Sequence, residues 1–377
     1  MTTPAEMLRW GPRSHLPPAT ICHGYSVKIP LISYPALKCW AIIILPLRGR
    51  SRAVARECDH SSALPTYEPS LTVGLLPRRS GSRGGSTCNE LIEPSLLDRI
   101  HQHAREWGVI VENTFETESS VISFVSRGGQ PLVLKVIKRP GDEWRAGEIL
   151  QAFDGNGVAR VHAWAPGAVL MERLTPGNSL AEMALNGRDE EATDILAGLI
   201  QKMSGHESAR SPLKLPNSCA TVQDWAKGFD RYLATGDAQV PTDLVALAHR
   251  IYSRLCVTQR RPKLLHGDLQ HYNVLFDSDR GWIAIDPKGV IGEVEYEIGA
   301  VLRNPIERPE LLLSLSTIER RLKQFTSRLN LDYERALAWG FAQAVLSAIW
   351  EIEDGFVVNT TKPTLRLAEI IRPMLQD

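Results

Sequence analysis

The stretch from residue 264 to residue 287 constrains the fold of this 377-residue chain most strongly. It is a short β-and-loop segment between sequences with helical periodicity, and its loop has the sequence HGDLQHYN at positions 266–273. A second apolar run, WIAID, ends on Asp286. Polar side chains at the ends of a loop and of a buried strand can meet at one site, so this segment predicts a functional centre.

The spacing of Asp268, Asn273 and Asp286 is typical of phosphoryl transfer from ATP. That reaction needs a carboxylate to position the attacking hydroxyl and oxygen ligands to hold Mg²⁺ on the phosphates. Asp268 suits the first task, and Asn273 and Asp286 suit the second. The alternative is an ordinary turn plus a structural aspartate. It could explain a lone His-x-Asp, but it explains three polar residues at these intervals poorly.

Residues 90–175 predict a small β-rich lobe. Its expected elements are a helix over 94–108, strands over 121–125 and 132–137 joined by a Gly-rich hairpin turn, a helix over 142–153, and strands over 159–164 and 168–174. The cluster TPGN at 175–178 ends this part and is expected to be a hinge.

Lys135 lies in the middle of the second predicted strand, between leucine and valine. An uncompensated ammonium is costly to bury, so Lys135 needs negative partners there. ATP phosphates and a glutamate on the next helix meet that need, and of Glu143 and Glu148 we favour Glu143. The alternative is a lysine at an exposed strand edge. Because the chain has no GxGxxG loop, Ser119 and Ser120 are expected to meet the phosphates instead.

Residues 176–377 turn predominantly helical. Apolar residues at helical spacing over 195–203 and over 244–255 predict helices packed in a core. A β-rich small lobe, a hinge and a helical large lobe together predict an α+β, two-lobed fold with a ligand cleft between the lobes.

Residues 1–89 differ from the rest in composition. They hold 11 Lys/Arg against 4 Asp/Glu, whereas the remainder holds 32 against 39, so the zero net charge joins a basic segment to an acidic one. Ten prolines and Arg/Ser/Gly tracts predict a disordered basic leader. The alternative is a tail that contacts nucleic acid, but without interleaved aromatics we expect no specific nucleic-acid partner. Because no Met lies between Met7 and Met171, an internal start that leaves residues 1–89 untranslated stays a hypothesis.

The longest apolar run in this leader is CWAIIILPL at 39–47. It is far shorter than the ~20 residues that span a bilayer, and it lies too far from the start for a signal peptide. The four cysteines before residue 90 show no metal-binding spacing. We therefore expect a cytoplasmic, monomeric protein with no membrane partner.

The chain from about residue 95 to 375 resembles the aminoglycoside phosphotransferases, whose fold is similar to that of protein kinases. The loop HGDL with NVL, followed by AIDPKGVIGE at 284–293 and by YE at 296–297, is similar to the streptomycin 6-phosphotransferase (aminoglycoside/hydroxyurea kinase) branch. Tyr272 departs from the pattern of that loop. We expect this difference to affect the packing of the loop more than its chemistry.

The resemblance implies a role for each motif residue. Asp268 would be the catalytic base, Asn273 and Asp286 the Mg²⁺ ligands, and Lys135 with Glu143 the pair that orders the ATP phosphates. The strand over 169–174 would hold adenine and add three residues to the nucleotide site: Met171, Glu172 and Leu174.

The resemblance also implies streptomycin as the substrate, phosphorylated on the 6-hydroxyl of its streptidine ring. Streptomycin carries two guanidinium groups, so its pocket should be acidic with some flat apolar surface. We expect Glu293, Trp350 and Glu351 to contact this cationic small molecule. The alternatives are a metabolic kinase of the same fold, acting on hydroxyurea, a sugar or an amino alcohol, and a catalytically dead kinase-like binding protein.

Overall fold

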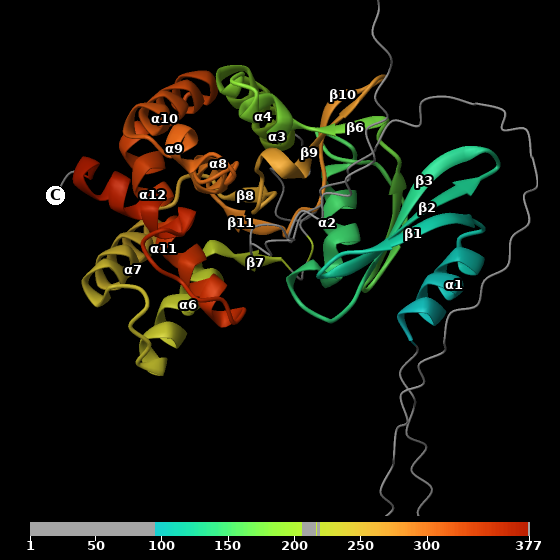
Figure 1. Ribbon diagram of the computed structural model, residues 1–377, viewed down its shortest axis with the longest axis horizontal. Coiled ribbons are helices and arrows are strands. Elements are labelled where there is room, and N and C mark those ends of the chain that lie inside the picture. The colour runs from blue at the N-terminus through green and yellow to red at the C-terminus, as the bar shows by residue number, and fades with distance from the viewer. Residues whose placement is uncertain (1–94, 206–215, 217–218, 376–377) are drawn as a thin grey trace, which may run out of the picture. The chain divides into compact units, whose positions relative to one another are not determined.

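The computed structural model describes residues 95–205, 216 and 219–375. Figure 1 shows a β-rich lobe beside a mainly helical lobe, so the predicted α+β, two-lobed architecture is confirmed. The predicted leader, residues 1–89, lies outside the described residues. The lobe limits at residues 90, 175 and 176, the monomeric state and the cytoplasmic location stay predictions.

The β-rich lobe is a five-stranded antiparallel sheet in the order β1-β2-β3-β5-β4. Its elements are α1 (Leu96–Glu106), β1 (Ile110–Glu116), β2 (Ser120–Arg127), β3 (Gln130–Ile137), a 3₁₀ helix (Asp142–Arg145), α2 (Ala146–Phe153), β4 (Val161–Ala165) and β5 (Ala168–Glu172). The predicted hairpin joins β2 and β3 through Gly128 and Gly129, whose positive φ angles suit a two-residue turn. The edge strand β1 was not predicted, because most of its side chains are exposed and polar.

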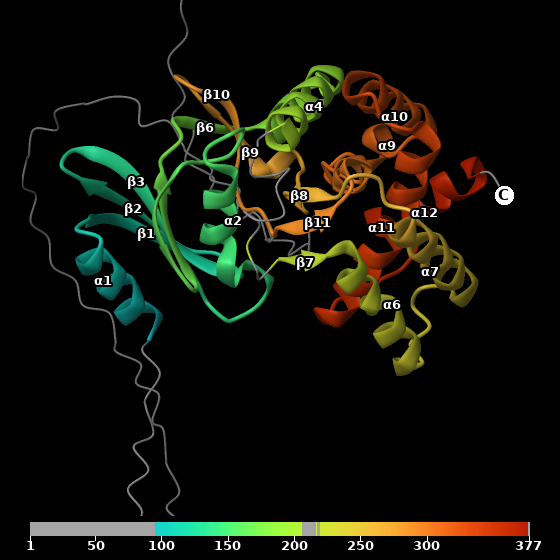
Figure 2. The ribbon, with the colours of Figure 1, turned by 180° about the vertical axis from the view of Figure 1, so that it is seen from behind.

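Two helices cover opposite faces of this sheet (Figures 1 and 2). On β3, Leu134 packs in one core with Ile100 of α1, whereas Val133 joins the other core with Ile149 of α2. Successive side chains of a strand point to opposite faces, so Lys135 lies on the same face as Val133. The register of β3 therefore directs this lysine to the side of α2 and of the helical lobe.

The second lobe is mainly helical, with two small three-stranded sheets. Its elements are β6 (Pro176–Ser179), α3 (Leu180–Leu185), α4 (Asp189–Gly205), β7 (Ala220–Thr221), α6 (Val222–Thr235), α7 (Thr242–Val257), β8 (Lys263–Leu265), a 3₁₀ helix (His271–Asn273), β9 (Val274–Asp277), β10 (Gly281–Ala284), β11 (Val290–Gly292), a 3₁₀ helix (Val294–Glu297), α8 (Ile298–Leu302), α9 (Pro309–Leu312), α10 (Leu315–Leu329), α11 (Tyr333–Glu353), α12 (Pro363–Ile371) and a 3₁₀ helix (Arg372–Met374).

Helix α11 is the centre of this lobe. All its residues from Ala336 to Ile349 are buried, and it packs against α6, α7, α8 and α12. The apolar stripes predicted over 195–203 and 244–255 lie on α4 and α7 and join the same core. None of the helices in the described ranges is both long and apolar enough to cross a membrane.

The short strands of the helical lobe hold the HGDLQHYN loop in place. β8 ends at Leu265 just before the loop, and β9 starts at Val274 just after it. β8 pairs with β11, where Leu265 lies opposite Val290, and β9 pairs with β6, which follows the connection from the first lobe. Strand pairing therefore holds both ends of the loop, next to the connection between the two lobes.

Candidate active site

Lys135 is the centre of an ion-pair network that joins the two lobes. Its buried Nζ lies 3.0 Å from Oε2 of Glu143 and 2.7 Å from Oδ1 of Asp286. Burial opposes the charged ammonium, but the two carboxylates outweigh that effect and raise the pKa of Lys135. The other candidate partner, Glu148, pairs with Arg145 instead. Of the two glutamates considered, Glu143 is the one that contacts the lysine.

His266 braces the loop that carries Asp268. Its Nε2 lies 2.8 Å from the carbonyl oxygen of Ile285, and its Nδ1 lies 3.3 Å from the backbone N of Asp268. A carbonyl only accepts, so Nε2 carries the proton and Nδ1 accepts from the Asp268 N–H. Burial lowers the pKa of His266 to about 4, which keeps the ring neutral at pH 7. The histidine therefore has a structural role.

Glu297 is a second brace of the loop, at the end of a 3₁₀ helix of the helical lobe. Its carboxylate accepts backbone N–H groups from His266 at 2.7 Å, Gly267 at 3.0 Å and Leu269 at 3.4 Å. Sequence spacing holds no signal for this contact, because Glu297 is 31 residues from His266 along the chain. Burial raises the pKa of Glu297 to about 7, although the three N–H donors favour the carboxylate.

This raised pKa predicts a pH-dependent stability. Folded, Glu297 keeps its proton up to a pH of about 7, but unfolded only up to its ordinary value of 4.5. Proton binding therefore favours the folded chain, and this stabilisation is lost as pH rises from 4.5 through 7. We expect the difference in unfolding free energy between the native chain and Glu297→Gln to change by about 2–3 kcal/mol across this window. Urea unfolding of both proteins near pH 5 and near pH 7.5 checks it; parallel pH profiles would contradict it.

Asn273 and Asp286 have the unsatisfied oxygens that a metal site requires. The Nδ2 of Asn273 donates to the carbonyl of Asp268 at 2.9 Å, and its buried Oδ1 has no hydrogen-bond partner within the described part of the chain. The same holds for the buried Oδ2 of Asp286. Such oxygens are costly unless a donor or a cation meets them, and Mg²⁺ prefers oxygen ligands. The two residues fit a Mg²⁺ ion.

The backbone of Asp286 is itself unusual. Its φ of +57° lies in the left-handed region, which a residue other than glycine rarely adopts. Strain of this kind persists where the surrounding structure over-determines it, often at functional sites. Here Asp286 pairs with Lys135 and lies between β10, which ends at Ala284, and β11, which begins at Val290.

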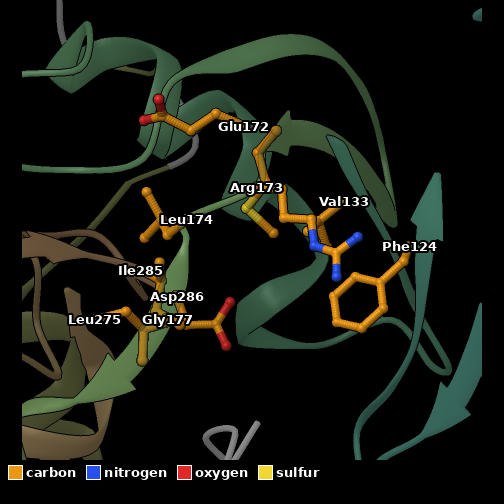
Figure 3. Close-up of a pocket in the computed structure, with 10 residues that line it drawn as sticks. Phe124, Val133, Glu172, Arg173, Leu174, Gly177, Leu275, Ile285 and Asp286 are labelled. Atoms are coloured by element: carbon orange, nitrogen blue, oxygen red, sulfur yellow. The ribbon is translucent and has the colours of Figure 1, made fainter. Parts of the chain in front are cut away.

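A mostly apolar pocket lies beside Asp286, between the sheet and the helical lobe (Figure 3). Its walls include Met171, Glu172 and Leu174, the three residues predicted for the nucleotide site. Two further residues line it that the sequence did not indicate: the guanidinium of Arg173 lies over the ring of Phe124, 3.9 Å from the ring centroid. This contact joins β2 to the strand end after β5, so only the folded sheet brings it about.

The two serines expected at the phosphates differ in their positions. Ser119 lines a second, wider cleft, and its Oγ lies 3.5 Å from Oε2 of Glu143. Ser120 is fully buried, and its Oγ lies 2.9 Å from Oγ1 of Thr117. The expectation for Ser120 is therefore wrong, because its hydroxyl is part of a turn and is closed to a ligand.

The wider cleft contains Asp268 together with groups from α6, from α11 and from the segment just after α8. Trp350 and Glu351, both expected at the substrate, lie on its wall. The ring of Trp350 meets that of Trp225 edge to face, with 5.4 Å between centroids. This wall thus offers flat aromatic surface and carboxylates within one cleft.

Glu293 lies outside both cavities, which corrects its predicted role as a substrate residue. It is fully buried, and its carboxylate accepts from Nε of Arg335, from Nε1 of Trp339 and from the backbone N–H of Arg260 at 2.9 Å. A fully buried carboxylate that already accepts from three donors has no oxygen open to a ligand. Proximity to Asp286 in sequence was misleading, because β11 carries the chain away from the cleft.

Several known proteins are similar in sequence to this chain. The family model for aminoglycoside/hydroxyurea antibiotic resistance kinases matches residues 107–355. A streptomycin 3''-kinase of Klebsiella pneumoniae is 37% identical over 63% of this chain and 86% of that protein. A hydroxyurea phosphotransferase of Kitasatospora aureofaciens is 29% identical over 73% and 78%, and a streptomycin 6-kinase of Streptomyces griseus 28% over 63% and 76%.

Solved structures match the fold at low sequence identity. A choline kinase from Streptococcus pneumoniae has a TM-score of 0.52 at 12% identity, over 74% of this chain and 100% of that chain. A thermostable mutant of an aminoglycoside phosphotransferase, in a ternary complex with AMP-PNP and hygromycin B, has a TM-score of 0.50 at 16% identity, over 74% and 99%. These likenesses confirm the kinase-like fold.

Proposed function

Because the chain belongs to the aminoglycoside/hydroxyurea antibiotic resistance kinase family, we propose that it transfers the γ-phosphoryl group of ATP to a hydroxyl of streptomycin. Phosphotransfer to a hydroxyl is the chemistry of this family, and the motif residues needed for it lie together between the two lobes. The presence of the complete set argues against a catalytically dead binding protein.

The proposed reaction assigns one task to each motif residue. The streptomycin hydroxyl gives its proton to the carboxylate of Asp268 as its oxygen bonds to the γ-phosphorus, and the bond from that phosphorus to the ADP oxygen breaks. Lys135, held by Glu143, would bind the phosphates of the nucleotide. Asn273 and Asp286 would hold Mg²⁺, which when bound neutralises charge on the phosphates.

The choice of streptomycin as the substrate rests on a set of buried hydrogen-bond acceptors in the wall of the wide cleft. Three oxygens there have no hydrogen-bond partner among the described residues: Ser347 Oγ, Asn304 Oδ1 and Glu351 Oε2. Ser347 and Glu351 lie one turn apart on α11, next to Trp350. A guanidinium supplies five N–H donors and stacks on aromatic rings, so a guanidinium-bearing substrate would satisfy this wall.

Glu351 should be the strongest single contact with the guanidinium. Burial raises its pKa, and Nζ of Lys362 lies 3.9 Å from Oε2. We expect Glu351→Gln to raise KM for streptomycin about 10- to 100-fold with a smaller effect on kcat, because a hydrogen bond to a charged group is worth about 1.5–3 kcal/mol. Coupled ADP release measures both constants.

Glu334→Gln is the matched control for this substitution. Glu334 lies on the same helix, but it is exposed and lies outside the walls of both cavities. KM should stay within about twofold of the native value in this variant, because an exposed carboxylate away from the cleft has no contact with the substrate. Equal rises in KM for the two variants would contradict a specific role for Glu351.

The position of the phosphate on streptomycin is a separate part of the proposal. The sequence motif favoured the 6-hydroxyl, but the streptomycin 3''-kinase is 37% identical to this chain and the Streptomyces griseus 6-kinase 28%. We therefore put the 3''-hydroxyl first and keep the 6-hydroxyl as the alternative. Phosphorus-coupled NMR of the purified product distinguishes the two.

Hydroxyurea is the second candidate substrate, because a hydroxyurea phosphotransferase is 29% identical over 73% of this chain. Hydroxyurea is small and has no guanidinium, so it would leave the acceptors of the cleft wall unsatisfied. Coupled ADP release with ATP, Mg²⁺ and either compound tests the choice. If hydroxyurea were turned over and streptomycin were not, streptomycin would be rejected as the substrate. The proposal that the protein is a phosphotransferase would still hold.

A further inference from the structure

Two cations flank the carboxylate of Asp268. Nζ of Lys288 lies 4.0 Å from Oδ2, and Nη2 of Arg303 lies 4.0 Å from Oδ1. Lys288 comes from the loop directly after the metal-ligand candidate Asp286, and Arg303 from the end of α8. Both line the wide cleft. None of the roles assigned above uses either residue.

The backbone around Lys288 is held firmly. The N–H of Gly289 donates to the carbonyl of His266 at 3.0 Å, which ties this loop to the loop of Asp268. Gly289 has a φ of +74°, and a Cβ there would come within 2.6 Å of the side chain of Ile149 on α2. Only glycine fits this position, so the base of the Lys288 side chain is fixed between Asp286 and Asp268.

Lys288 and Arg303 differ in their exposure and in their contacts. Nη1 of Arg303 donates to the carbonyl of Gly299 at 3.2 Å and to Oε1 of Gln343 at 3.4 Å, and its side chain is 14% exposed. The side chain of Lys288 is 28% exposed and lies over the ring of Trp350, 5.8 Å from its centroid. Arg303 is thus held by two hydrogen bonds, whereas the more exposed ammonium of Lys288 lies at the cleft.

The chemistry of phosphoryl transfer calls for a cation at this place. Negative charge spreads over the three equatorial oxygens of the phosphoryl group in the transition state. The loop from Asp268 to Asn273 contains no Lys or Arg, and Lys135 is engaged with Glu143 and Asp286. A hydroxyl bound to Asp268 would place the phosphorus roughly 5–6 Å from that carboxylate. This is within reach of the Lys288 ammonium.

We propose that Lys288 is a catalytic residue that binds the phosphoryl group during its transfer, and that Arg303 is a positioning residue for Asp268. The proposal rests on the phosphotransferase function proposed above. The acceptor oxygen bonds to the γ-phosphorus, the bond from phosphorus to the ADP oxygen breaks, and the hydroxyl proton passes to Asp268. Lys288 keeps its protons and donates hydrogen bonds to the equatorial oxygens.

Lys288→Met tests the proposal through two readouts on the full chain. We expect kcat for streptomycin to fall about 10²- to 10³-fold, as when one donor to a developing charge is removed. In thermal unfolding, AMP-PNP with Mg²⁺ should stabilise the variant as it stabilises the native protein. The added stabilisation by ADP, Mg²⁺ and aluminium fluoride, which mimics the phosphoryl group in transfer, should be lost.

Two further variants make the test specific. Lys288→Arg keeps a cation and should recover at least about tenfold of the lost kcat. Lys323→Met removes an exposed lysine of α10 that pairs with Glu319, and it should match the native protein in both readouts.

The outcomes separate this proposal from the proposed function. A fall in kcat of less than about fivefold in Lys288→Met, or equal stabilisation of that variant and the native protein by the aluminium fluoride complex, would overturn the role of Lys288. The role of Lys288 would also be overturned if the aluminium fluoride complex raised the thermal stability of the native protein no more than ADP alone does. Because that complex forms without an acceptor, it tests Lys288 even if streptomycin proves not to be the substrate.

Discussion

Asp268→Asn should lower kcat for streptomycin about 10³-fold, the largest effect on activity that we expect from one substitution. The carboxylate is the group that takes the hydroxyl proton, and general-base catalysis typically contributes 10²- to 10⁴-fold. The hydrogen bonds that shape the loop use the backbone N–H and C=O of Asp268, which the substitution leaves in place. Coupled ADP release measures the fall, and thermal unfolding with AMP-PNP should show unchanged nucleotide binding.

Asp194→Asn is the matched control for this experiment. Asp194 is an exposed residue of α4, outside the walls of both cavities. Its variant should keep native kcat and KM. If Asp268→Asn retained more than about a tenth of the native kcat, a proton acceptor other than Asp268 would have to be sought in the cleft.

Glu293→Ala should cause the largest loss of stability, about 3–5 kcal/mol of unfolding free energy. Removing one partner of a buried ion pair leaves the other as an uncompensated charge. Here the side chain of Arg335 is only 10% exposed, and the indole N–H of Trp339 would lose its acceptor as well. Urea unfolding at pH 7 measures the loss.

The same variant decides between a structural and a substrate role for Glu293. Assayed at a temperature where it stays folded, it should show native KM for streptomycin. Glu293→Gln keeps an acceptor for Trp339 and should lose less stability. It can be assayed in place of Glu293→Ala if that variant does not fold. Glu353→Ala, which breaks an exposed pair, should cost about 1 kcal/mol or less. A small loss of stability with a large rise in KM would restore Glu293 to the substrate site.

Several parts of the site follow from sequence because they depend on local spacing. Asp268 and Asn273 lie in one short loop, and the side chain of Asn273 reaches back to the carbonyl of Asp268. The position of Lys135 inside an apolar strand favoured its burial in the sheet. The cost of burying an ammonium then calls for negative partners, of which Glu143 was predicted, whereas the contact with Asp286 appears only in the structure.

Where several acids had similar sequence surroundings, spacing was a poor guide. Glu293 and Glu297 both follow Asp286 closely, yet Glu293 joins a core ion pair and Glu297 holds the catalytic loop by three N–H groups. Glu351, much farther along the chain, reaches the cleft wall. The direction of each side chain depends on how β11, the following 3₁₀ helix and α11 pack.

The two-lobed fold, the motif residues and the preference for Glu143 over Glu148 follow from the sequence, because strand and loop periodicities and the intervals within one loop are local properties. The contact of Glu297 with the loop, and the positions of Lys288 and Arg303 beside Asp268, appear only in the tertiary structure. These contacts join residues from separate strands and helices. Their geometry is set when the elements pack against one another, which no interval along the chain specifies.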